Sequence, residues 1–129
     1  MVKLNCIRQI AINVQDVPRA VAFYRDILGM HFLFELPSMG FFDCGEIRLM
    51  LSKTELPQSE RTALIIYYKV DDIQQTYETL SQQGVEFVSA PSLVAPMPEH
   101  DLWMAFLHDP DKNLLALMSE VVRPPQENL

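Results

Sequence analysis

One arginine within an otherwise apolar stretch indicates a specific kind of chemistry, the binding of an anion. Arg48 falls between Ile47 and Leu49 in an alternating segment, so we expect its side chain on the opposite face of a strand from theirs. A buried guanidinium needs an anionic partner and can hold a carboxylate or phosphate through paired hydrogen bonds. That partner is either a ligand or a carboxylate of the chain, Glu35 or Glu46, unless Arg48 reaches solvent at a rim.

A histidine and a tryptophan further along the chain are the next candidates. His100 lies between Glu99 and Asp101, and nearby carboxylates stabilise a charged imidazole that can act as an acid or base near neutral pH. We expect it in a proline-rich loop, residues 91–101. That loop is either solvated, with Trp103 packed under a helix, which is the interpretation we favour, or it covers the mouth of a pocket. Trp103, the only tryptophan, either stacks on a ligand or anchors a hairpin in the core.

A strand, a capped helix and a second strand must position the first of these residues. Residues 10–14 alternate as a strand, and Asp16 stands where a helix N-cap belongs. Apolar residues then recur at helical spacing until Gly29, a residue free to adopt the conformation that ends a helix. A further strand follows, and then a hairpin that turns near Cys44.

The same design returns in the second half of the chain. A strand begins near residue 64, Asp72 caps the next helix and Gly84 ends it. Each half reads β-α-β-β-β in about 60 residues, too few to close a core alone. We predict an α+β fold in which two pseudo-twofold-related modules form a curved mixed sheet with a concave pocket. The expected parts are one domain (1–122) with modules 5–52 and 63–119, a linker (53–62) and a poorly ordered tail (120–129).

The sheet face that the helices leave free has the composition of a small-molecule pocket. Strand parity places a few polar side chains there among apolar ones. The alternative is a face buried against a second subunit. Residues on this face include Gln9, Arg48, Met50, Ile65, Tyr67 and Ala116.

Three stretches together resemble the vicinal oxygen chelate superfamily, which includes glyoxalase I, extradiol dioxygenases and bleomycin-resistance proteins. They are INVQDVPRAVAFYRDILGM, the end of the first hairpin, and FLHDPDKNLLALMSE, and the resemblance covers roughly residues 7–119. It implies the glyoxalase-like form of the fold above, and says little about activity because the superfamily hosts many chemistries.

The resemblance also bears on metal binding. In metal-using members, four pocket-facing strand positions supply His, Gln or Glu ligands, and the matching positions here are Gln9, Met50, Ile65 and Ala116. Isoleucine and alanine have no donor atom, and a thioether suits soft metals. The resemblance therefore implies the fold without the usual divalent metal site, and we expect no metal and no cofactor.

Composition narrows the partners and the compartment. The net charge is −7, from seventeen acidic and ten basic residues, which disfavours nucleic acid. No apolar run is long enough to cross a membrane, and the start of the chain lacks a signal-peptide core. Cys6 and Cys44 show no CxxC spacing, which suits a cytoplasmic protein in a reducing compartment. We expect both cysteines to be small buried residues and not metal ligands.

Three functional hypotheses remain, because no GxSxG, GxGxxG or HExxH motif occurs. The first is a protein that binds a small organic molecule without a metal, of the resistance or sequestration type. The alternative is a metal-dependent lyase or isomerase of the glyoxalase type, with ligands drawn from His31, His100 or His108, so catalysis stays an open question. The third is a scaffold dimer with a closed cavity; open sheet edges favour a homodimer in any case. The candidate ligand-binding residues are Gln9, Arg48, Met50, Tyr67, His100 and Trp103.

Overall fold

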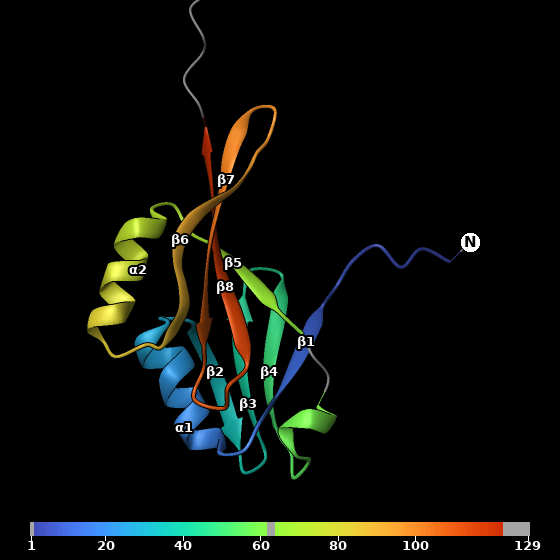
Figure 1. Ribbon diagram of the computed structural model, residues 1–129. Helices are drawn as coiled ribbons and strands as arrows, with labels where there is room; N and C mark the ends of the chain where they lie inside the picture. Colours follow the sequence, from blue (N-terminus) through green and yellow to red (C-terminus); the bar gives the residue numbers. More distant parts are fainter. Residues whose placement is uncertain (1, 62–63, 123–129) are drawn as a thin grey trace, which may run out of the picture. The chain divides into compact units, whose positions relative to one another are not determined.

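Two units with the same order of elements make up the chain. The computed structural model describes residues 2–61 and 64–122. The first unit is Met1–Leu64 with Pro110–Asn113, and the second is Ile65–Asp109 with Leu114–Leu129. Each contains a four-stranded mixed sheet and a helix in the order β-α-β-β-β (Figure 1). The predicted α+β fold of two such modules is confirmed; that they form one domain stays a prediction.

The first unit has the strand order β1-β4-β3-β2, with β1 parallel to β4 and the other neighbours antiparallel. A π-helical turn extends its helix, and the predicted linker contains a short 3-10 helix. The elements are β1 (Gln9–Val14), α1 (Val17–Ala22), η1 (Phe23–Ile27), β2 (His31–Leu36), β3 (Met39–Cys44), β4 (Ile47–Lys53) and η2 (Gln58–Glu60).

Both predicted ends of the first helix are confirmed. The Asp16 side chain accepts a hydrogen bond from the Arg19 backbone N–H at 3.1 Å, as an N-cap should. At the other end the helix widens into η1, where the Leu28 N–H donates to the Phe23 carbonyl at 3.0 Å. Gly29 then turns the chain with φ of 71°, a conformation that costs glycine little. The helix therefore begins and ends for local reasons.

The helix α1 lies on β3 at a point where only glycine fits. The buried face of α1 consists of Val17, Ala20 and Val21. A Cβ atom built on Gly40 would lie 2.7 Å from Cγ2 of Val21, closer than real Cβ atoms approach. This contact fixes which face of the first sheet the helix covers and leaves the opposite face free of helix.

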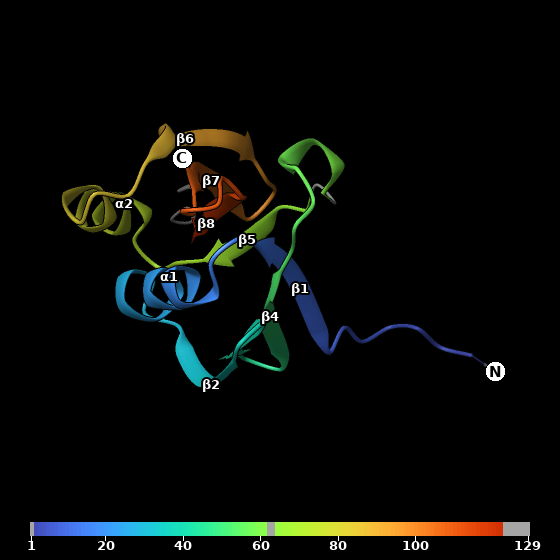
Figure 2. The same ribbon diagram turned by 90° about the horizontal axis from the view of Figure 1, so that it is seen from below.

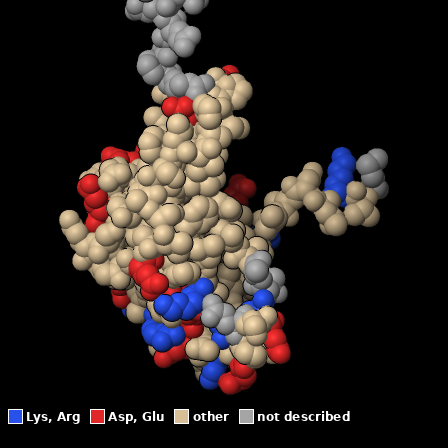
Figure 3. Space-filling model, in the orientation of Figure 1, with Lys and Arg blue, Asp and Glu red and all other residues tan. Residues whose placement is uncertain are grey.

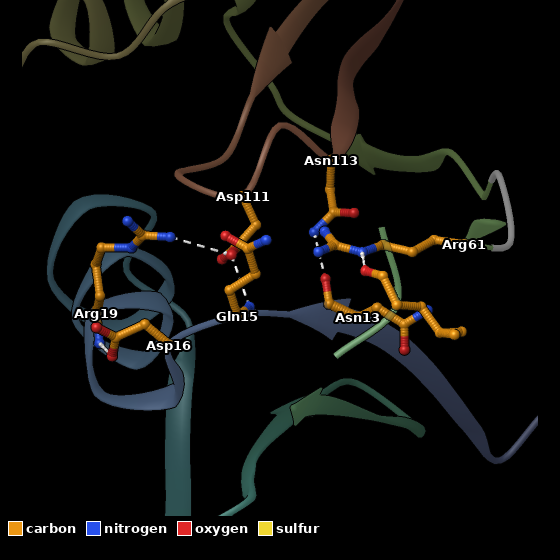
Figure 4. Close-up of polar contacts among 8 residues, drawn as sticks. Asn13, Gln15, Asp16, Arg19, Arg61, Asp111 and Asn113 are labelled. Carbon is orange, nitrogen blue, oxygen red and sulfur yellow. Dashed lines mark hydrogen bonds and ion pairs between the residues drawn. The ribbon is translucent and has the colours of Figure 1, made fainter. Parts of the chain in front are cut away.

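A turn from far along the sequence completes the first unit. Oδ1 of Asp111 accepts from the Gln15 backbone N–H at 2.7 Å and from Nη2 of Arg19 at 3.1 Å (Figure 4). The amide of Asn113 donates to the Asn13 carbonyl at 2.9 Å. The Asp111 side chain is 0% exposed, so the carboxylate of its ion pair with Arg19 is shielded from solvent. We call residues 110–113 the returning turn.

The second unit repeats the order as β5-β8-β7-β6, again with one parallel pair, β5 with β8. Asp72 caps its helix by accepting from the Gln75 N–H at 3.0 Å, as predicted. Figure 2 shows α2 beside β6, and the helix buries Ile73 and Leu80. The elements are β5 (Ile66–Lys69), α2 (Ile73–Gln82), β6 (Phe87–Pro96), β7 (His100–His108) and β8 (Leu114–Val122).

The prediction of a loop over residues 91–101 is wrong, because most of this segment is β-strand. β6 continues to Pro96 and β7 begins at His100, so only residues 97–99 turn. β6 pairs with β7 alone, and an edge strand tolerates a proline that lacks an N–H. Register shifts on both sides of Ser92 absorb the irregularity near Pro91.

Two smaller expectations also change. The predicted tail is strand as far as Val122, while residues 123–129 lie outside the described part. Both cysteines are exposed and free, not buried. Partial desolvation, with the Asp43 carboxylate beside it, raises the pKa of the Cys44 thiol and makes it a weak nucleophile.

Within the described residues, neither α-helix has the length and hydropathy needed to cross a membrane.

Candidate functional site

A β-bulge in β2 places two phenylalanines on opposite faces of the first sheet. Phe32 pairs with Phe42, whereas Phe34 pairs with Phe41, so the register shifts between the two β2 residues. Phe32 meets Phe42 edge-on at 5.5 Å, on the α1 side. Phe34 stacks on Phe41 at 4.6 Å, on the free side. Period-2 alternation alone would have put Phe32 and Phe34 on one face, which is why the sequence did not predict this aromatic pair.

Polar side chains from β1 and β4 surround these rings. Cζ of Arg48 lies 5.8 Å from the centroid of the Phe41 ring. Nε of Arg48 donates to Oε1 of Gln9 at 2.6 Å, and Nε2 of Gln9 lies 4.0 Å from the sulfur of Met50. The structure thus brings together three of the predicted residues from one sheet face. We call Gln9, Phe34, Phe41, Arg48 and Met50 the Arg48 face.

The charge on Arg48 is not paired within the described part of the chain. Neither Glu35 nor Glu46 lies within ion-pair distance, although both were candidate partners. Glu46 instead uses its backbone carbonyl to accept from Nη1 of Arg8 at 3.0 Å. Arg48 is half-buried, and its side chain has Gln9 as its only hydrogen-bond partner among these residues, so both terminal nitrogens remain available to an anion.

Tyr67 belongs to the second unit, where it lies on β5. It pairs with Ala116 on β8 and meets Phe106 edge-on at 6.2 Å. The face that carries them is the one that α2 does not cover. The Tyr67 side chain is exposed there and could contribute to a binding surface.

His100 is the first residue of β7, not part of a covering loop. Its Nε2 lies 3.6 Å from Oε2 of Glu120, a carboxylate supplied by β8. His108 ends the same strand, and its Nδ1 lies 3.5 Å from Oε1 of Glu86. Each of these histidines therefore faces a carboxylate of its own unit.

Trp103 lies on the other face of the second sheet from Tyr67. It pairs with Ser119, three residues beyond Ala116 on β8, and an odd separation along a strand means opposite faces. Trp103 lines a groove of about 390 Å³ at the start of α2. Trp103 and Tyr67 therefore cannot wall the same pocket. The register of β7 could not be predicted from the sequence, and without that register the sheet face on which Trp103 lies could not be predicted either.

The side chains at the four family metal positions do not fit a divalent cation. Gln9 and Met50 offer an amide and a thioether in the first unit, and Ile65 and Ala116 offer no donor in the second. No group of three or more His, Cys, Asp or Glu side chains in the described chain is arranged to hold a metal ion.

Comparisons with known proteins agree with this architecture. The sequence model of the Glyoxalase/Bleomycin resistance protein/Dioxygenase superfamily matches residues 7–117. The uncharacterised protein YraH of Bacillus subtilis is 28% identical over 123 residues, covering 84% of this chain and 94% of YraH. The metallothiol transferase FosB of Staphylococcus haemolyticus is 29% identical over 87 residues, 64% of this chain and 63% of FosB.

A solved structure matches in fold. The glyoxalase/bleomycin resistance protein/dioxygenase of Alicyclobacillus acidocaldarius has a TM-score of 0.72 at 22% identity, covering 93% of this chain and 95% of that one. At this identity the match supports the fold and leaves the ligand to be argued from the site.

Proposed function

Because the chain belongs to the Glyoxalase/Bleomycin resistance protein/Dioxygenase superfamily, we propose that it binds a small organic molecule and that the Arg48 face holds an anionic, aromatic ligand. The observation that carries the proposal is the half-buried guanidinium of Arg48, which forms no ion pair with any carboxylate of the described chain. A ligand carboxylate would supply the missing charge through a bidentate contact.

Each residue of the Arg48 face has a distinct part in such binding. Gln9 accepts from Nε of Arg48 and so positions the guanidinium while leaving its terminal nitrogens free. Phe34 and Phe41 are already stacked, and they offer a flat apolar surface beside the charge. Met50 adds a flexible wall that adapts to ligand shape.

The charge balance of the first unit does not oppose an anion, despite the negative charge of the whole chain. The described residues of the first unit contain eight Lys and Arg and eight Asp and Glu. The unit is therefore close to neutral. Asp43 lies opposite Arg48 in the register of β3 and β4, but the two side chains form no ion pair.

Replacing Arg48 with alanine tests the proposal. Phenylacetate, a flat ring with one carboxylate, is a suitable probe, with 2-phenylethanol as its neutral counterpart. We expect Arg48→Ala to weaken phenylacetate binding at least about tenfold and to shift the melting temperature by less than about 2 °C. Isothermal titration calorimetry measures the first and a thermal melt the second.

Arg25 provides the matched control. Its Cζ also lies over a phenylalanine, 5.6 Å from the Phe32 centroid, but Asp26 occupies its guanidinium at 2.8 and 3.1 Å. Arg25→Ala should leave phenylacetate binding unchanged. Equal affinities for the two variants, or equal affinities of the wild type for phenylacetate and 2-phenylethanol, would refute the role given to Arg48.

The metal-dependent alternative has one observation in its favour, the activity in the name of the relative FosB. The donor chemistry of Gln9 and Met50 argues against it. Metal analysis of protein purified without chelator distinguishes the two. Stoichiometric metal would replace the metal-independent proposal with a lyase or isomerase that uses other ligands.

A cytoplasmic homodimer is the second part of the proposal. The edge strands β2 and β6 carry exposed apolar side chains, among them Leu33 and Leu36 on β2 and Val88 and Val94 on β6. Exposed apolar edges pair readily with a second chain, and free cysteines suit a reducing compartment. Sedimentation equilibrium should give about twice the chain mass of 14.8 kDa, and a monomer at every concentration would contradict the dimer.

A further inference from the structure

The groove beside Trp103 shares no residue with the Arg48 face. Its volume of about 390 Å³ is within the range of small-molecule pockets. It lies within the second unit, between the start of α2 and the strands that α2 covers. Its lining includes Asp71, Asp72, Ile73, Pro91, Trp103 and Ser119.

The groove combines apolar walls with oxygen acceptors. Trp103, Ile73 and Pro91 supply the apolar surface. Ser119 is 2% exposed, and its hydroxyl donates a long bond of 3.4 Å to the Asp71 carbonyl. The Asp71 carboxylate itself has no hydrogen-bond or ion-pair partner among the described residues.

The partial positive charge at the N-terminus of α2 does not neutralise the carboxylates of Asp71 and Asp72. A helix N-terminus carries about half a unit of positive charge, and two carboxylates outweigh it. Asp72 already uses that end of the helix, because its side chain accepts from the Gln75 N–H. The negative charge of the Asp71 carboxylate is therefore available to a ligand.

The electrostatics of the whole second unit point the same way. Its described residues contain eight Asp and Glu, and Lys69 is the one Lys or Arg among them. In Figure 3 the surface around α2 shows red carboxylates and no blue. Such a field concentrates cations and repels anions.

We infer that this groove binds an organic cation: an amine or quaternary ammonium group attached to an apolar body. The indole face of Trp103 attracts a cation through its π-electrons, and the Asp71 carboxylate pairs with it directly. The apolar walls take the body of the ligand. A neutral molecule would gain from the walls alone.

Tryptophan fluorescence measures this site selectively, because Trp103 is the only tryptophan in the chain. The probes are 2-phenylethylammonium, 2-phenylethanol and phenylacetate, which share a ring and differ in charge. We expect the cation to change the emission with an affinity about tenfold higher than that of the alcohol. Phenylacetate should leave the emission unchanged at the same concentrations.

Two single substitutions separate a local contact from bulk charge. Asp71→Asn should weaken binding of the cation about fivefold and leave 2-phenylethanol unaffected. Glu55→Gln makes the same charge change on an exposed residue of the first unit and should have no effect. Equal affinities for cation and alcohol, or equal effects of the two substitutions, would overturn the inference.

Discussion

Replacing Asp111 with alanine is expected to lower the free energy of unfolding by about 2–3 kcal/mol. The carboxylate is buried and satisfies both the Gln15 N–H and the Arg19 guanidinium. Alanine would leave that N–H without its acceptor and would release the returning turn from the start of α1. Urea denaturation followed by circular dichroism gives the difference.

Asp26 is the matched control for this substitution. It also pairs with an arginine, Arg25, but on the surface, and the hydrogen bond from Arg25 lowers the pKa of its carboxyl. Because water already solvates that pair, Asp26→Ala should leave the urea midpoint almost unchanged. If Asp111→Ala unfolds at the same midpoint as Asp26→Ala, the returning turn is not held by its carboxylate.

Phe32 and Phe34 should give opposite results although they are two residues apart. Phe32 packs on Phe42, which in turn contacts Tyr24, so Phe32→Ala should cost about 2–3 kcal/mol of stability. Phe34 is 49% exposed and stacks on Phe41, so Phe34→Ala should cost less than about 1 kcal/mol. Phe34→Ala should nevertheless weaken phenylacetate binding at the Arg48 face.

The measurements are urea unfolding and calorimetric titration on both variants. Similar losses of stability in the two would mean that the bulge in β2 does not separate their faces. Unchanged phenylacetate affinity in Phe34→Ala would remove the stacked rings from the proposed site and leave Arg48 to act without them.

Local signals explain why much of the fold could be predicted. Asp16 and Asp72 cap their helices through the bonds that their side chains favour, and Gly29 and Gly84 adopt positive φ after them. These features depend on neighbours within a few residues. The βαβββ order followed from them.

The candidate site was predicted only in part, because its remaining members depend on register. Parity placed Gln9, Arg48 and Met50 on one face, and the structure brings them together. Phe34 reaches the same face because of a β-bulge, which the alternation of residues in β2 does not indicate. Pairing between distant strands decides such features, so local pattern could not reveal them.

The same limit applies to the second unit. Prolines near Pro91 favoured a loop, but an edge strand accommodates them without losing a ladder bond. His100 therefore lies in a strand and not in the predicted loop. The face of Trp103 followed from its pairing with Ser119, which joins two strands across a turn.

The returning turn has a consequence for synthesis on the ribosome. The first unit is discontinuous, since its first 64 residues need Asp111 and Asn113 to satisfy the Gln15 N–H and the Asn13 carbonyl. A nascent chain that has emerged only to residue 64 lacks both. Completion of the first unit must therefore wait until residues 110–113 have been translated, so it cannot precede the synthesis of most of the second unit.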